Sequence, residues 1–195
     1  MLLSRLRPTA IAVLLVALFA GGVLLAYAQW TDPLIEADRA LAAGETQRAL
    51  ALFATAEARF RRFGLAQQVF SREHARAVYN QLALLFQAGE YDAVLEKAAT
   101  APLGAAPRFW SGSALFARAM AKSKPEERLV WLTRAEDEFR QALAAKPDDW
   151  DTKYNYELAA RLAAELRKEP KKKPDSLMQL LRPQPQQGRP ARRVG

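Results

Sequence analysis

The feature that most constrains this chain is a stretch without charge near its N-terminus. No Asp, Glu, Lys or Arg occurs in residues 8–31, and residues 11–27 are almost entirely apolar. A helix needs about 20 consecutive apolar residues to cross the hydrocarbon core of a bilayer. We therefore expect residues 1–31 to be a membrane anchor or a signal peptide, followed by a folded domain in residues 32–169.

The charges on either side of this segment predict its orientation. Arg5 and Arg7 precede it, whereas Asp32, Glu36 and Asp38 follow it. Basic residues next to a span favour the cytoplasmic side. We therefore expect a single-pass protein of the cytoplasmic (inner) membrane, with its N-terminus inside and its domain in the periplasm.

A cleaved signal peptide is the alternative to an uncleaved anchor. Ala26 and Ala28 form the small-x-small pattern that precedes a cleavage site, and the charged, apolar and small-residue regions come in the required order. Cleavage after Ala28 would make the protein a secreted one. Both routes export the residues that follow, so the expected side of the membrane is the same.

Composition excludes most kinds of site chemistry. Cys is absent and His occurs once, at position 74, which excludes cysteine nucleophiles, disulfides and sites with two imidazoles. We interpret His74 as an exposed side chain near a helix start, and acidic pairs such as Glu126–Glu127 as solvated helix faces. No phosphate-binding glycine loop accompanies them. We therefore expect no enzyme activity, catalytic residue, metal, cofactor or small-molecule substrate.

The net charge of +8 resides at the two ends of the chain. Residues 8–169 carry 20 basic and 20 acidic side chains. A neutral body lacks the basic face that nucleic-acid binding requires. We therefore expect no nucleic-acid partner.

Apolar residues recur every three or four positions through residues 32–169, as on one face of a helix. Gly44 and Gly89 stand at equivalent turns between paired helices. We expect one helix from Asp32–Pro33 to residue 43, a second from residue 45 to about Gly64, and a third that ends near residue 86. Further helices are expected from residue 91 to about Pro102, over residues 110–119, from Pro125 to Pro147 and from Asp149 to Lys168. The fold class expected from this pattern is all-α: antiparallel helix hairpins in about three irregular repeats, with a capping helix at the end.

The second helices of these hairpins share a small–aromatic–small pattern. Its members are Ala135, Phe139, Ala142 and the following Pro147 in one copy, and Ala49, Phe53 and Ala56 in another. With Gly112 at a small-residue position of a first helix, the chain resembles the tetratricopeptide repeat (TPR), an α-solenoid of helix hairpins. The middle copy departs from the family because Ala98 replaces the aromatic residue. The copies also lie 45 and 41 residues apart, from Ala49 to Val94 and from Val94 to Ala135, instead of about 34.

A looser resemblance concerns the whole chain. The apolar N-terminal segment, the irregular repeats and residues 146–158 are similar to bacterial envelope TPR proteins of the MxaK and Bat group, which are associated with MoxR ATPases and von Willebrand factor A-domain proteins. This resemblance implies an assembly or scaffold role. The implied partner is a von Willebrand factor A-domain or another envelope protein.

A TPR domain binds partners in the groove lined by the first helix of each hairpin, so the resemblance implies which side chains form the binding surface. By repeat position these are Arg76, Tyr79, Asn80, Phe86, Phe109, Ser113, Phe116, Tyr154, Asn155 and Arg161. The alternative is that the aromatic residues among them are part of the core. The paired lysines with which some members hold a peptide carboxylate have no counterpart here, so that activity is not expected.

Residues 170–195 form a separate basic tail that we expect to be disordered. They contain five of the eleven prolines, and seven Lys or Arg against the single acid Asp175. The tail is either a solvated extension or an active element, and in the second case the protein is a structural or regulatory membrane protein that acts on anionic lipid or on a partner. The residues that would carry this activity are Lys171, Lys172, Lys173, Leu177, Leu180 and Leu181.

Overall fold

The structure is a computed structural model that describes residues 3–62 and 64–168. Within these residues it is all-helical, as expected, and has no strand. Its helices are α1 (Leu3–Ala42), α2 (Thr46–Arg62), α3 (Gly64–Val69), α4 (Ser71–Gln87), α5 (Tyr91–Ala99), α6 (Ala105–Met120), α7 (Pro125–Ala145) and α8 (Trp150–Lys168). The tail residues 170–195 lie outside the described part, so the expectations for them stay predictions.

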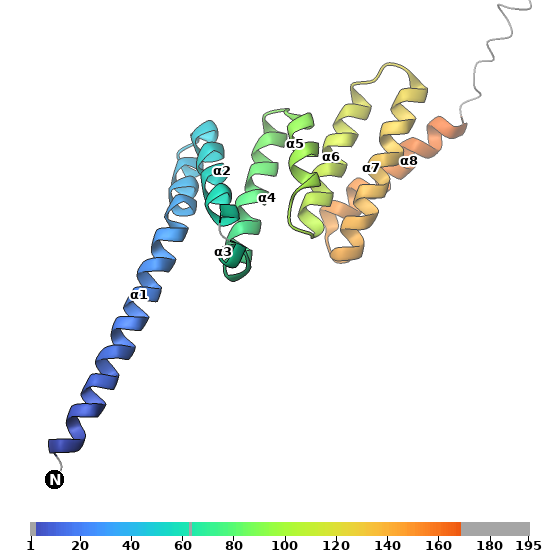
Figure 1. Cartoon of the computed structure of the whole chain (residues 1–195). Helices are drawn as coiled ribbons and strands as arrows, with labels where there is room; N and C mark the ends of the chain where they lie inside the picture. The colour runs from blue at the N-terminus through green and yellow to red at the C-terminus, as the bar shows by residue number, and fades with distance from the viewer. Residues whose placement is uncertain (1–2, 63, 169–195) are drawn as a thin grey trace, which may run out of the picture.

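The helices from the C-terminal part of α1 to α8 stand side by side in a row (Figure 1). Within the described chain, the backbones of α1, α4, α6 and α8 each come close to that of the next member of this set, whereas the backbones of α2, α5 and α7 stay farther apart from one another. Lys97 on α5 reaches Glu57 on α2 only through its long side chain. The row therefore has two layers. We call the layer of α1, α4, α6 and α8 the first-helix layer, and that of α2, α5 and α7 the second-helix layer.

The expected turns and caps are present. Gly44 and Gly89 have φ of 76° and 77°, a conformation that glycine adopts at little cost. After Gly44 the amide of Glu45 donates to the carbonyl of Ala40 (2.8 Å), and after Gly89 the amide of Glu90 donates to that of Leu85 (3.0 Å), as in a Schellman motif. The two hairpin turns are thus equivalent, as the sequence predicts.

The prediction that a new helix begins at Asp32–Pro33 is wrong, because α1 runs through this point without a break. A proline inside a helix has no amide hydrogen for the carbonyl four residues earlier, which here belongs to Gln29. The guanidinium of Arg59 on α2 donates to that carbonyl oxygen instead, at 2.5 Å. The tertiary contact replaces the missing helix bond and lets one helix extend from the apolar segment into the domain.

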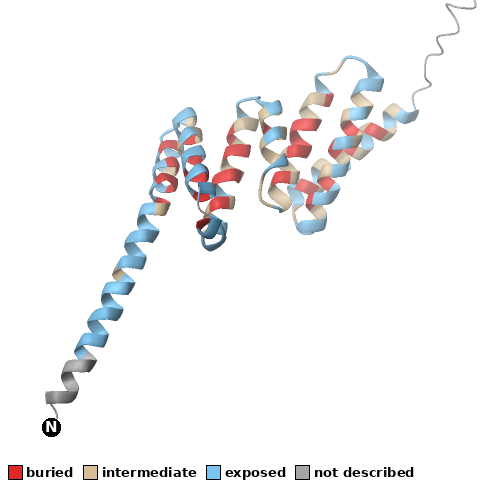
Figure 2. Ribbon diagram, in the orientation of Figure 1, coloured by how far each residue is buried: buried red, intermediate tan, exposed pale blue. Residues whose placement is uncertain are grey.

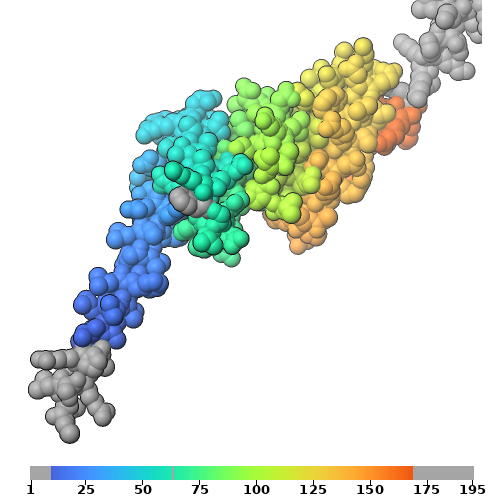
Figure 3. Space-filling view, viewed as in Figure 1, coloured from blue at the N-terminus to red at the C-terminus, as the bar shows by residue number. Residues whose placement is uncertain are grey.

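The N-terminal part of α1 projects away from the row of helices (Figure 3). Its apolar side chains are exposed, whereas buried residues gather between the helices of the row (Figure 2). By length and composition α1 is able to cross a membrane. The coarse expectation of one apolar N-terminal helix is therefore confirmed.

The core consists mainly of alanines that surround a few large rings. The small–aromatic–small residues of α2 and α7 are all buried: Ala49, Phe53, Ala56, Ala135, Phe139 and Ala142. A Cβ placed on Gly112 of α6 would lie 2.8 Å from ring carbons of Phe139. The missing side chain at this position therefore lets the Phe139 ring pack directly against α6.

Candidate interaction surface

The first-helix layer carries all ten residues predicted to bind a partner. On α4, Arg76 is exposed and forms an ion pair with Asp38 of α1. Tyr79 and Asn80 are half-buried, and burial raises the pKa of the Tyr79 phenol. Phe86, also half-buried, packs against the core instead of standing free. The α4 part of the surface is thus polar at Arg76 and Asn80, whereas both of its aromatic residues are half-buried against the core.

On α6 the predicted residues are mostly enclosed. The Phe109 ring lies 5.0 Å from that of Trp110 and 6.2 Å from that of Phe139. Ser113 is buried and its hydroxyl donates to the carbonyl of Phe109 at 2.9 Å. Phe116 is half-buried between two core clusters. This middle helix therefore uses its aromatic residues to join neighbouring helices.

On α8 the predicted residues lie mainly in solvent. Tyr154 is 66 % exposed, Arg161 is exposed and Asn155 is half-buried. The sequence interpretation missed Trp150, which is 78 % exposed at the start of the same helix and has the Lys153 ammonium 4.7 Å from its ring centre. Its position four residues before Tyr154, one helical turn, could have identified it. Trp150 and Tyr154 together form an exposed aromatic pair.

The predicted surface therefore differs from helix to helix along the first-helix layer. The contacts run from α4 to α6 and from α6 to α8, but α4 and α8 do not touch. Exposed side chains are found at α4 and α8, and α6 between them offers half-buried rings. The role of these residues in partner binding stays a prediction.

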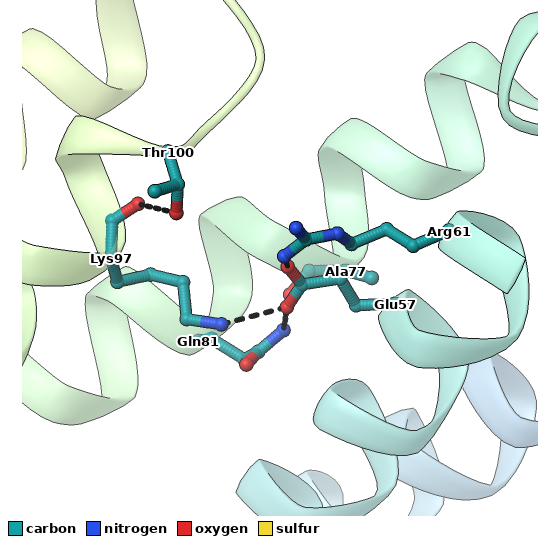
Figure 4. Close-up of polar contacts among 6 residues, drawn as sticks. All are labelled: Glu57, Arg61, Ala77, Gln81, Lys97 and Thr100. Atoms are coloured by element: carbon teal, nitrogen blue, oxygen red, sulfur yellow. Dashed lines mark hydrogen bonds and ion pairs between the residues drawn. The ribbon is translucent and has the colours of Figure 1, made fainter.

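A buried polar cluster that the sequence did not indicate connects α2, α4 and α5 (Figure 4). The Glu57 carboxylate is 6 % exposed and accepts from Lys97 (2.8 Å) and from Gln81 (2.8 Å), with Arg61 at 3.6 Å. Burial alone would raise the pKa of Glu57. The hydrogen bonds from Lys97 and Gln81 and the nearby positive charges outweigh this effect and hold the pKa below its ordinary value.

The interpretation of His74 as an exposed side chain is wrong. It is 5 % exposed, its ring centre lies 6.2 Å from that of Phe60, and its Nε2 has no hydrogen-bond partner. The packing of α4 against α2, where Phe60 lies, accounts for this burial. Burial lowers the pKa of His74, although the Glu57 charge opposes this shift.

The geometry offers little for chemistry in the described residues. An open hollow of about 220 Å³ between α5, α6 and α7 is crossed by the Arg108–Glu138 ion pair (3.1 Å). It is smaller than the roughly 300–1,000 Å³ of ordinary ligand pockets. No group of three or more His, Asp or Glu that could hold a metal is found within the described ranges. We assign no ligand to this hollow.

Comparisons of the chain with protein-family models, with curated proteins and with solved structures find no match. The function is therefore argued from the chain's own residues.

Proposed function

We propose that this protein is a membrane-anchored, periplasm-facing scaffold with a TPR-like domain, which binds a partner protein through its first-helix layer. The observation that carries the proposal is the two-layer row of helices. Helix hairpins whose first helices come closer to one another, backbone to backbone, than their second helices do curve toward the first helices and create a concave side. Such a side is where an extended partner segment is held.

The buried residues support the TPR-like assignment. The small–aromatic–small patterns of α2 and α7 bury every member, and Phe139 packs over Gly112. These are the positions that the resemblance marks as contacts within a hairpin. The irregular spacing of the copies is accommodated by the additional short helix α3 and the long helix α7.

Anchoring is supported by the exposed apolar half of α1 and by the aromatic residues that follow it. Tyr27 and Trp30 stand where interfacial aromatic residues are enriched. Arg5 and Arg7 before the span and the acids after it favour export of the domain. The partner is then an exported or membrane protein, and a von Willebrand factor A-domain protein is the one the resemblance implies.

Trp150 and Tyr154 are the best candidates for an aromatic anchor in this interaction. Exposed aromatic residues dominate many binding surfaces, since they bury a large area with few rotatable bonds. Because both residues are exposed and lie outside the core, we expect their removal to leave the fold intact.

The test is photo-crosslinking in the native membrane. A photoreactive amino acid at position 154 should join the protein to one dominant exported partner, whereas the same group at Val130, which is 59 % exposed on the second-helix layer, should not. Tyr154→Ala combined with Trp150→Ala should lower partner recovery at least about tenfold, the loss expected for a hot-spot pair. Equal crosslinking from positions 154 and 130 would contradict the proposal.

Deletion of residues 170–195 separates this proposal from action through the basic tail. If the groove binds the partner, the shortened protein should recover it as well as the full chain does. If the shortened protein fails to recover the partner and a photoreactive group at position 154 gives no crosslink, the function belongs to the tail.

A further inference from the structure

One end of the α2–α4 hairpin lies beside the point where the apolar segment of α1 ends. The Trp30 ring stacks with Phe60 (5.9 Å) and Phe70 (5.8 Å), and the Tyr27 ring lies 5.8 Å from that of Phe70. Arg59 reaches the Gln29 carbonyl from the same end of α2. The connector α3 between α2 and α4 is thus fixed at the level of residues 27–30 of α1 (Figure 1).

This connector displays apolar side chains to the outside. Leu65 is 78 % exposed and Val69 is 75 % exposed, and their spacing of four residues places them on one face of α3. Nothing in the described chain covers this face. It lies at the depth at which a spanning α1 would leave the hydrocarbon.

Basic side chains lie around α1 at the level of residues 27–31. A hollow of about 440 Å³ between α1 and α2 is lined by Arg59 and Arg62, and one of about 250 Å³ between α1 and α4 is lined by Arg72 and Arg76. Both hollows also include residues of the 27–31 segment of α1. Arg59 also donates to the Gln29 carbonyl, Arg76 pairs with Asp38, and Glu73 lines the second hollow as well. Guanidinium groups at this depth match the phosphates of lipid headgroups in charge and geometry.

We propose that the α3 end of the domain is itself a membrane-binding surface, with Leu65 and Val69 entering the interface of an anionic bilayer and the arginines holding lipid phosphates. The inference rests on the proposed function, since it requires α1 to span the bilayer. Its consequence is that the row of helices is held at a fixed tilt to the membrane by two contacts instead of one. The first-helix layer is then presented to partners in a defined direction.

The absence of natural cysteine makes the test direct. Full-length single-cysteine variants carrying an environment-sensitive fluorophore are reconstituted in vesicles of phosphatidylcholine and phosphatidylglycerol, with spin-labelled lipids as quenchers. Leu65→Cys reports on α3, Leu18→Cys on the span and Leu103→Cys, in a loop residue that is 95 % exposed, on the solvent-facing part. A spin label near the headgroup should quench the label at position 65 at least about twofold more than that at position 103.

The outcomes separate this inference from the proposed function. Quenching at position 18 without quenching at position 65 overturns the membrane contact of α3 and leaves the anchored scaffold intact. No quenching at position 18 overturns the span and with it both proposals. A blue-shifted label at position 65 that responds to protein density and not to lipid quenchers means a second copy covers α3, which also overturns the inference.

Charge variants test the lipid phosphates separately. Arg62→Gln with Arg72→Gln should abolish the extra quenching at position 65 that phosphatidylglycerol produces over pure phosphatidylcholine. The pair Arg39→Gln and Arg48→Gln changes the net charge equally at other exposed places and should leave it unchanged. Equal behaviour of the two pairs would show that the arginines bind no lipid.

Discussion

Glu57 shows how one buried charge can hold three helices together. Its carboxylate on α2 accepts hydrogen bonds from Gln81 on α4 and Lys97 on α5, so all three helices meet at one group. The pKa of Glu57 is held below its ordinary value of 4.5, which means the folded protein favours the ionised form more than the unfolded chain does. This part of the stability is complete at neutral pH and is lost as the pH falls from about 4.5 through the lower pKa of the folded state.

Glu57→Gln should lower the free energy of unfolding at pH 7 by about 1–3 kcal/mol, because Lys97 loses its charged partner in a half-buried place. The loss should shrink as the pH falls below 4.5, because the carboxylate of the parent protein is then protonated as well. Urea unfolding of the full chain in detergent from pH 7 to pH 3 measures this. Glu165→Gln, at an exposed position of α8, is the control and should change stability little at any pH.

Position 112 requires glycine because the Phe139 ring packs closely against it. Gly112→Ala should destabilise the domain by about 1–3 kcal/mol, because the new Cβ would lie 2.8 Å from the Phe139 ring, which is buried and has no room to withdraw. Thermal unfolding compares it with Gly64→Ala, where nothing lies within 4 Å of the added atom. Equal melting temperatures of the two variants would mean that the Phe139 ring can move away from the added Cβ, which contradicts the prediction.

At the scale of elements, α1 is one helix with two environments. Its first part is exposed and apolar, and its last part contributes Leu34, Ala37 and Ala40 to the core with α2 and α4. The helix survives Pro33 because Arg59 donates to the Gln29 carbonyl that the proline leaves unpaired. The continuity of the apolar segment with the domain thus depends on a contact between two helices.

A double-mutant cycle tests this contact. Arg59→Met alone should destabilise the full chain by about 1 kcal/mol, because the Gln29 carbonyl loses its donor. In a Pro33→Ala background the alanine amide supplies the helix bond, so the same substitution should cost less, with a coupling of about 0.5–1 kcal/mol. Additive effects, measured by urea unfolding in detergent, would show that Arg59 does not replace the missing bond.

At the scale of the whole molecule, the helix that carries the apolar segment also supplies residues 27–42 to the contacts with the domain. Tyr27 and Trp30 pack on Phe70, and Leu34 is buried against the domain. Removal of the exposed part of α1 therefore differs from removal of all of α1. A signal-peptide cleavage after Ala28 would remove the Tyr27 contact and keep the Trp30 and Leu34 contacts.

A chain that begins at Gln29 should stay helical and unfold cooperatively without detergent, because it retains the α1 residues of the core. A chain that begins at Gly44 should lose cooperativity, since Phe53 and Phe60 would become exposed along α2. Circular dichroism during thermal unfolding distinguishes them. Identical unfolding curves would contradict the assignment of the last part of α1 to the domain.

The sequence by itself determined the all-helical class, the apolar N-terminal helix and most helix ends. These features follow from local signals: the apolar period, Pro125 at a helix start, Asp149 as the cap that accepts from the Thr152 amide (3.2 Å), and glycines at Gly44 and Gly89. The small and aromatic residues of the repeated pattern are buried in α2 and α7.

Only the tertiary structure decided which predicted surface residues are free. Phe109 and Phe116 share a helical period with exposed residues, but the neighbouring helices cover them, and such coverage leaves no local signal. The same holds for the burial of His74, which depends on the packing of α4 against α2. It holds also for the helix through Pro33, where Arg59, thirty residues beyond Gln29, donates to the Gln29 carbonyl. Local periodicity determines where helices form, whereas the packing of residues distant in sequence determines which of their faces remain exposed.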